Sequence, residues 1–105
     1  MQKSELVGLF AESRAGHDKG RTYVIFHDEV ISGGASEYVY VVDGKLRTIE
    51  NPKRKNIKHL IITKNMTEYQ VALELREKLL NNIPVSNEEI KFVIRAMSRE
   101  KGSGF

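Results

Sequence analysis

The spacing of apolar and polar residues changes once along the chain, near residue 66. Before that point, short β-branched and aromatic segments separated by turn residues predict strands. After it, apolar residues recur every three or four positions, which predicts helices. We therefore expect a mainly β protein with a C-terminal α part, made of a folded unit over 1–65, a helical extension over 66–101 and a flexible tail over 102–105.

Five short strands are expected in the first part, at residues 6–10, 21–26, 38–42, 45–50 and 59–63. Closely spaced short strands favour a small closed barrel, because closure removes the exposed edges of so small a sheet.

Turn residues separate these strands. The polar loop 15–20 contains two glycines, and Ser32-Gly33-Gly34 marks a second break. Asp43-Gly44 predicts a tight hairpin. Asn51-Pro52 is expected to end the fourth strand, since proline cannot donate to a ladder, and Lys53–Asn56 is then expected to be a loop.

Two helices are expected in the second part, over 68–80 and 87–99. Thr67 and Ser86 each precede a Gln or Glu by three residues, which is the capping-box pattern of a helix start. The first helix should stop before Pro84. The two helices are expected to pair as a hairpin, and the sequence leaves open whether the apolar stripe of the second is core or interface. That stripe consists of Ile90, Val93, Ile94 and Met97.

Basic residues are concentrated in one stretch of the chain. The 105 residues carry 17 Lys and Arg against 14 Asp and Glu, a net charge of +3. Residues 45–64 hold seven of the cations and only Glu50 as an acid, whereas 1–44 are net acidic. A compact cationic cluster suits a polyanion, because bound phosphates release condensed counterions. The alternative is a solvated lysine-rich turn.

The sequence lacks the residues that several kinds of catalytic and metal-binding site require. There is no cysteine, which excludes disulfides and thiolate metal sites and fits a reducing compartment. His17, His27 and His59 lie far apart without a carboxylate at ligand spacing, and no serine stands in a nucleophile elbow. We therefore expect no enzyme activity, no metal and no cofactor. The longest apolar runs are far shorter than a membrane span, so a cytoplasmic protein is expected.

A turn with two glycines and a basic residue lies between apolar segments near the start of the chain. The turn is Ala15-Gly16-His17-Asp18-Lys19-Gly20-Arg21, and the apolar segments on either side of it are Leu6–Phe10 and Tyr23–Phe26. This stretch resembles a KOW motif. Together with Val42–Arg47, Asn51–Lys55 and Lys58–Leu60, it is similar to the eukaryotic-type KOW ribosomal proteins of the large subunit and their short bacterial relatives. The resemblance covers about residues 5–62, and residues 66–105 have no counterpart in it.

The resemblance implies an SH3-like barrel that binds RNA, usually ribosomal. It assigns Gly16, Asp18 and Gly20 to loop geometry and places Lys19 and Arg21 near the nucleic acid. His17 and His59 are expected to add donors beside the basic surface. The expected RNA-binding residues are Arg14, His17, Lys19, Arg21, Lys45, Arg47, Lys53, Arg54, Lys55, Lys58 and His59.

Two functions follow from these patterns. The first is non-catalytic binding of ribosomal RNA or a ribosome-associated RNA through phosphates and 2′-hydroxyls. The second is a protein-interaction module of the translation or transcription machinery, possible ribosomal-protein contacts included, that docks through its C-terminal helices. DNA binding is a weaker third possibility, because neither helix has a basic face. The sequence does not specify which RNA is bound, nor the oligomeric state.

Overall fold

The computed structural model describes residues 5–29, 37–65 and 69–102, with side chains described up to residue 97. This part of the chain forms one antiparallel sheet and two C-terminal helices, so the prediction of a mainly β protein with a C-terminal α part is confirmed. The hydrogen-bonded strand order is β4-β3-β2-β1-β5. The strands are β1 (Phe10–Ser13), β2 (Thr22–Glu29), β3 (Tyr38–Val42), β4 (Lys53–Asn56) and β5 (Leu60–Thr63).

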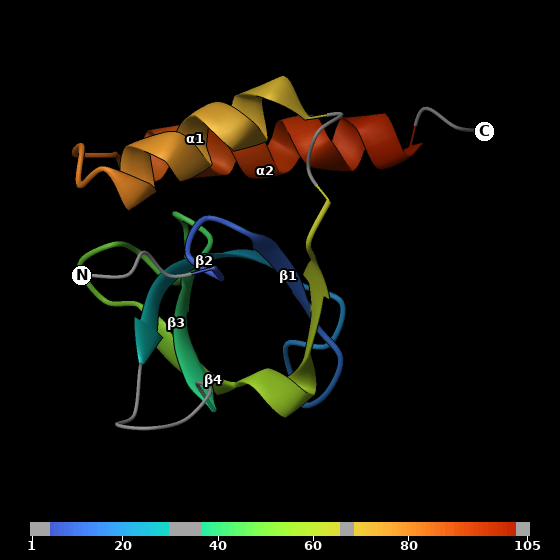
Figure 1. Ribbon diagram of the computed structural model, residues 1–105. Coiled ribbons are helices and arrows are strands. Elements are labelled where there is room, and N and C mark those ends of the chain that lie inside the picture. Colours follow the sequence, from blue (N-terminus) through green and yellow to red (C-terminus); the bar gives the residue numbers. More distant parts are fainter. Residues whose placement is uncertain (1–4, 30–36, 66–68, 103–105) are drawn as a thin grey trace.

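The sheet is strongly curled, and both helices cover one side of it (Figure 1). The two outer strands, β4 and β5, are joined by one 3-10 turn, η1 (Ile57–His59), so they follow each other directly in the chain. A register shift between Ile25 and His27 interrupts the pairing of β2 with β3. Irregularities of this kind bend a strand and increase its twist.

The prediction of a strand over 45–50 after a tight Asp43-Gly44 hairpin is wrong. Residues 43–52 form a long connection instead, which we call the basic loop after its cations Lys45 and Arg47. The Asp43 carboxylate accepts hydrogen bonds from the backbone N–H groups of Lys45 (2.9 Å) and Arg47 (2.8 Å). These bonds fold the chain back on itself, because an Asp side chain can replace the backbone partner that a strand would supply.

The prediction that 53–56 is a loop is also wrong, since this segment is β4. It pairs with β3 from Val41 opposite Lys53 to Tyr38 opposite Asn56. The apolar alternation that predicts a strand is missing here, because the inward-facing residue Lys55 is a buried lysine rather than an apolar residue.

The first strand starts later than predicted, at Phe10 rather than at residue 6. Gly8 has a φ of +86°, which is incompatible with a regular extended strand. Arg76 lies against this point and donates hydrogen bonds to the carbonyl oxygens of Val7 (3.1 Å) and Glu5 (3.0 Å). A Cβ atom at Gly8 would collide with the Arg76 side chain, so the close approach requires glycine.

The helices α1 (Gln70–Leu80) and α2 (Asn87–Gly102) follow the predicted pattern, although α2 continues to Gly102 instead of ending near residue 99. Asn82 has a φ of +56° and ends α1 with the paired hydrogen bonds of a Schellman motif. Ser86 caps the start of α2 as predicted, because its hydroxyl accepts from the N–H of Glu89 (3.1 Å), while the Glu89 carboxylate accepts from Lys78 Nζ (2.6 Å). The capping box predicted at Thr67, the break at 32–34 and the tail residues 103–105 lie outside the described residues.

One hydrophobic core joins the helices to the sheet. Its members from the sheet side include Phe10, Tyr23 and Val41, and its members from the helices are Ala72, Leu75, Ile90, Val93 and Met97. The apolar stripe of α2 is therefore core, with Ile94 packed beside it. The unit predicted over 1–65 and the extension predicted over 66–101 thus share their buried interior. Within the described ranges, neither helix has the length and apolar character needed to cross a bilayer.

Candidate functional site

The connection between β1 and β2, residues 14–21, is a compact loop. Gly16 and Gly20 both have positive φ values, +83° and +89°. The N–H of Arg21 donates to the carbonyl of Asp18 at 3.0 Å, which closes the turn before β2 begins. Both glycines thus have the backbone geometry that the loop was expected to need. The turn directs the Asp18 side chain inward and leaves Arg21 on the surface.

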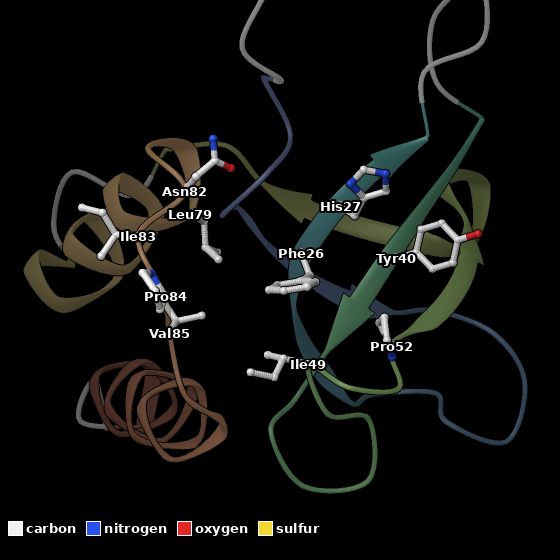
Figure 2. Close-up of a pocket in the computed structure, with 10 residues that line it drawn as sticks. All are labelled: Phe26, His27, Tyr40, Ile49, Pro52, Leu79, Asn82, Ile83, Pro84 and Val85. Atoms are coloured by element: carbon white, nitrogen blue, oxygen red, sulfur yellow. The ribbon is translucent and has the colours of Figure 1, made fainter.

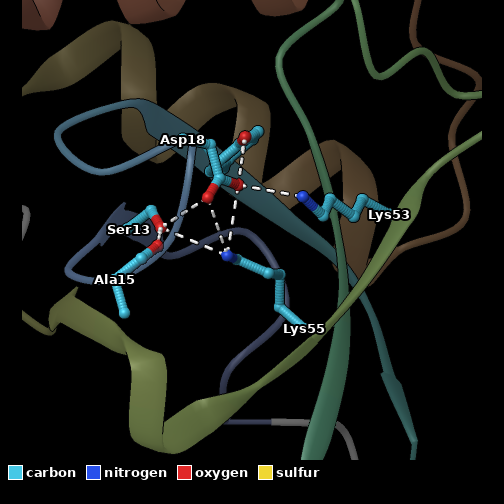
Figure 3. A network of polar contacts seen from close by, with 6 residues as sticks. Ser13, Ala15, Asp18, Lys53 and Lys55 are labelled. Atoms are coloured by element: carbon cyan, nitrogen blue, oxygen red, sulfur yellow. Dashed lines mark hydrogen bonds and ion pairs between the residues drawn. The ribbon is translucent and has the colours of Figure 1, made fainter.

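The Asp18 carboxylate lies at the centre of a buried polar network (Figure 3). Lys55 Nζ donates to Oδ1 at 3.2 Å, and Lys53 Nζ donates to Oδ2 at 3.1 Å. The hydroxyl of Tyr23 donates to Oδ2 at 2.9 Å, and that of Ser13 lies 3.2 Å from Oδ1. The network therefore joins the loop 14–21 to β1, β2 and β4.

This network shifts the pKa values of two of its members. Burial alone would raise the pKa of Asp18, but hydrogen bonds from Lys55, Lys53 and Tyr23 outweigh it and hold that pKa well below its usual range. Burial and the hydrogen bond to Asp18 raise the pKa of Tyr23 to about 12. Asp18 is thus an anion and Tyr23 a neutral donor at neutral pH. These charge-assisted hydrogen bonds stabilise the loop against β1, β2 and β4.

The three neighbouring cations of β4 do not form the single exposed patch that the sequence predicted. Alternate residues of a strand point to opposite faces, so Lys53 and Lys55 face Asp18 while Arg54 faces outward. Lys55 is 8% exposed and forms an ion pair with Asp18, so its ammonium group is not presented to solvent. Arg54 donates two hydrogen bonds to Glu29, at 2.9 and 3.0 Å, and lowers the pKa of that carboxyl.

Four groups of the predicted site, Lys53 of β4 among them, converge on one hollow of about 350 Å³, which we call the cationic hollow. Arg21 and His17 come from the loop 14–21, Arg47 from the basic loop and Lys53 from β4. The remaining lining residues are Asp18, Tyr23 and Leu46. Since the charge of Asp18 is balanced by Lys53 and by Lys55 beneath it, Arg21 and Arg47 leave the hollow with excess positive charge.

The basic loop is held in place by α2. Asn87, the first residue of α2, accepts a hydrogen bond from the N–H of Ile49 (2.9 Å) and donates to the Glu50 carboxylate (2.8 Å). A Cβ atom on Gly44 would lie only 2.4 Å from the Asn87 carbonyl oxygen, so the loop and the helix start are in close contact. The sequence contains no local signal for this support, because Asn87 is 38 residues away from Ile49.

The other predicted RNA-binding residues lie outside the cationic hollow. Lys19 and Lys45 are exposed on the loops that form its rim. Arg14, Lys58 and His59 lie together at another position, where the N–H of Arg14 donates to the His59 carbonyl at 2.9 Å. The structure thus divides the predicted site into a hollow with its rim, a group at η1, and the paired residues of β4.

A larger and mostly apolar groove of about 760 Å³ lies between the sheet and the connection from α1 to α2 (Figure 2). Ile49 and Pro52 of the basic loop line this groove, so the loop separates it from the cationic hollow. His27 lies in it beside Tyr40, with ring centroids 5.8 Å apart. Within the described ranges, no group of three or more metal-ligating side chains gathers at this groove or elsewhere.

No family model and no curated protein matches the chain.

Proposed function

We propose that this protein binds RNA through its phosphate backbone at the cationic hollow and does not catalyse a reaction. The observation that carries this proposal is the convergence of Arg21, Arg47 and Lys53 on one hollow from three separate segments. Arginine pairs with phosphate through two parallel hydrogen bonds, while lysine adds a point charge. His17 adds a further donor at the same place.

The proposal extends to the fold. The curled sheet, with its outer strands joined by the single turn η1, supports an SH3-like barrel of the KOW type. The turn with Gly16, Asp18 and Gly20, which carries the sequence resemblance, forms part of the wall of the hollow. A large-subunit ribosomal RNA, or an intermediate of its assembly in the cytoplasm, is then the preferred partner.

Recognition at this site is expected to depend on shape and charge more than on base sequence. Sequence-specific RNA binding commonly stacks unpaired bases on exposed aromatic rings. Tyr23 is buried in the core, and the Tyr38 ring is covered by the Arg54 guanidinium, whose central carbon lies 3.7 Å from the ring centroid. Tyr23 is therefore unable to stack on a base, and Tyr38 has one face already occupied.

The test is RNA binding measured over a range of salt concentrations, with Arg47→Gln and Arg54→Gln as a matched pair. If the hollow and its rim contact about three to five phosphates, the log–log salt slope is about −2 to −4. Arg47→Gln should weaken binding and make the slope shallower by about 1. Arg54→Gln removes the same charge from a group paired with Glu29 and should change neither quantity. A wild-type affinity that does not vary with salt would refute the proposal.

Sedimentation of a cell lysate through sucrose tests the ribosomal part of the proposal. The wild-type protein should travel with large ribosomal subunits at low salt, and Arg47→Gln should shift it to the light fractions. Association that is unaffected by Arg47→Gln would instead favour the protein-interaction module.

A further inference from the structure

A second, smaller hollow lies on the α2 side of the basic loop. Its volume is about 230 Å³, and its charged lining residues are Asp43, Lys45, Lys91 and Arg95. Lys91 and Arg95 are four residues apart in α2 and therefore lie on the same face of that helix. Neither was among the expected RNA-binding residues, because the charges of the helices balance in the sequence.

The two hollows are neighbours across one narrow ridge. Arg21 lines the cationic hollow, and the next residue, Thr22, lines the second. In the same way Leu46 and Arg47 line the first, and Lys45 lines the second. Consecutive residues of two segments thus line the two hollows, so the hollows lie next to each other.

The acidic groups in and near the second hollow leave its cations able to bind an added anion. Asp43 Oδ1 already accepts two backbone N–H groups of the basic loop. Lys91 Nζ pairs with Glu88 Oε1 at 2.7 Å, but the Glu88 side chain is 83% exposed, and an exposed pair of this kind contributes little and yields readily to a stronger anion. Within the described ranges, no carboxylate forms an ion pair with Arg95 or Lys45.

We propose that the RNA backbone bound in the cationic hollow continues across the basic loop onto α2, where Lys91 and Arg95 bind further phosphates. This inference rests on the proposed function and assigns a role to the helical extension. Leu46, which is 60% exposed at the ridge, provides an apolar contact between the two groups of cations. The hydrogen bonds of Asn87 to the basic loop fix the distance between the two hollows.

The test compares the double variant Lys91→Gln/Arg95→Gln with the charge-matched double variant Arg54→Gln/Lys64→Gln, which lies outside both hollows. The probes are a double-stranded RNA of mixed sequence and an oligouridylate. Loss of two phosphate contacts should make the salt slope of Lys91→Gln/Arg95→Gln shallower by about 1 to 2 and lower its affinity, while the matched variant stays at the wild-type values. Circular dichroism shows whether both variants remain folded.

A variant that is expected to bind RNA more tightly gives a result that loss of folding cannot explain. Glu88→Gln frees Lys91 from its ion pair and should raise RNA affinity at low salt. The inference is overturned if Arg47→Gln weakens binding but Lys91→Gln/Arg95→Gln matches its control and Glu88→Gln has no effect. The proposed function itself then stands, whereas a wild-type protein that binds neither probe would refute both.

Discussion

The ammonium group of Lys55 lies inside the protein, where most lysines are excluded by the cost of removing charge from water. It pairs with Asp18 at 3.1 Å and donates to the hydroxyl of Ser13 at 3.2 Å. The side chains of Lys55 and Asp18 are only 9% and 12% exposed. The pair therefore specifies how the loop 14–21 lies against β4, and the shape of the cationic hollow depends on it.

Removing the charge of Lys55 tests this structural role. Lys55→Met preserves most of the side-chain volume but leaves Asp18 with one cation fewer in a buried site. We expect the free energy of unfolding to fall by about 2–4 kcal/mol, because breaking a buried pair leaves a charge uncompensated. Urea denaturation measures the change. The double variant Asp18→Asn/Lys55→Met should lose less than the sum of the two single variants, and strict additivity would show that the two groups do not interact.

The shifted pKa of Asp18 predicts acid sensitivity. The hydrogen bonds from Lys55, Lys53 and Tyr23 hold the pKa of folded Asp18 below 3.8, its ordinary value, which it regains on unfolding. A lowered folded-state pKa contributes stability above that ordinary value, and the contribution is lost as the pH falls below about 4. Urea denaturation at pH 7, 4 and 3 should show a steeper decline for the wild type than for Asp18→Asn. Parallel declines would contradict the assignment.

Among the elements, the basic loop depends most on a distant partner. Asn87→Ala removes the acceptor of the Ile49 N–H and the donor to Glu50. We expect a loss of about 1–2 kcal/mol in the free energy of unfolding, with faster hydrogen exchange at Ile49. RNA affinity should fall as well, because Arg47 and Lys45 are carried by this loop. Asn81→Ala, which removes an exposed bond at the C-terminal end of α1, is the control and should leave exchange at Ile49 unchanged.

The elements also show where sequence patterns fail. The pattern of apolar residues predicted β2, β3 and β5 from their β-branched and aromatic segments, and both helices from apolar positions three or four residues apart. It failed at β4 and at the basic loop for one physical reason. Both depend on polar contacts. In β4 the contact is the distant one of Lys55 with Asp18, and in the basic loop it is the local bonds to Asp43 together with the distant bond of Asn87 with Ile49. A period of apolar residues carries no information about such contacts.

The candidate site was predictable only in part for the same reason. Arg21 and Arg47 could be proposed from the basic composition and the resemblance, and they do line one hollow. The separation of Arg54 from Lys53 and Lys55 required knowing that β4 is a strand. Lys91 could not be selected at all, because its position beside the basic loop depends on how α2 packs on the sheet.

For the whole molecule, the shared core decides whether the sheet can exist without the helices. Leu75, Ile90, Val93 and Met97 are buried in the same cluster as the sheet residues. Each such side chain contributes roughly 1.5–3 kcal/mol when it is fully buried. Their sum is comparable with the roughly 5–15 kcal/mol that stabilises a typical domain. A chain that ends after Thr63 should therefore show no cooperative thermal unfolding by circular dichroism.

This expectation determines how the two candidate functions can be separated. Loss of RNA or ribosome association on truncation after Thr63 would follow from unfolding under either hypothesis, so it cannot show that the helices dock onto a protein. Substitutions on the surface of α2, such as Lys91→Gln/Arg95→Gln, leave the core residues in place and avoid this ambiguity. If the truncated chain instead unfolds cooperatively near the wild-type temperature, the helices are dispensable for folding. Truncation would then become the more direct test of what α2 binds.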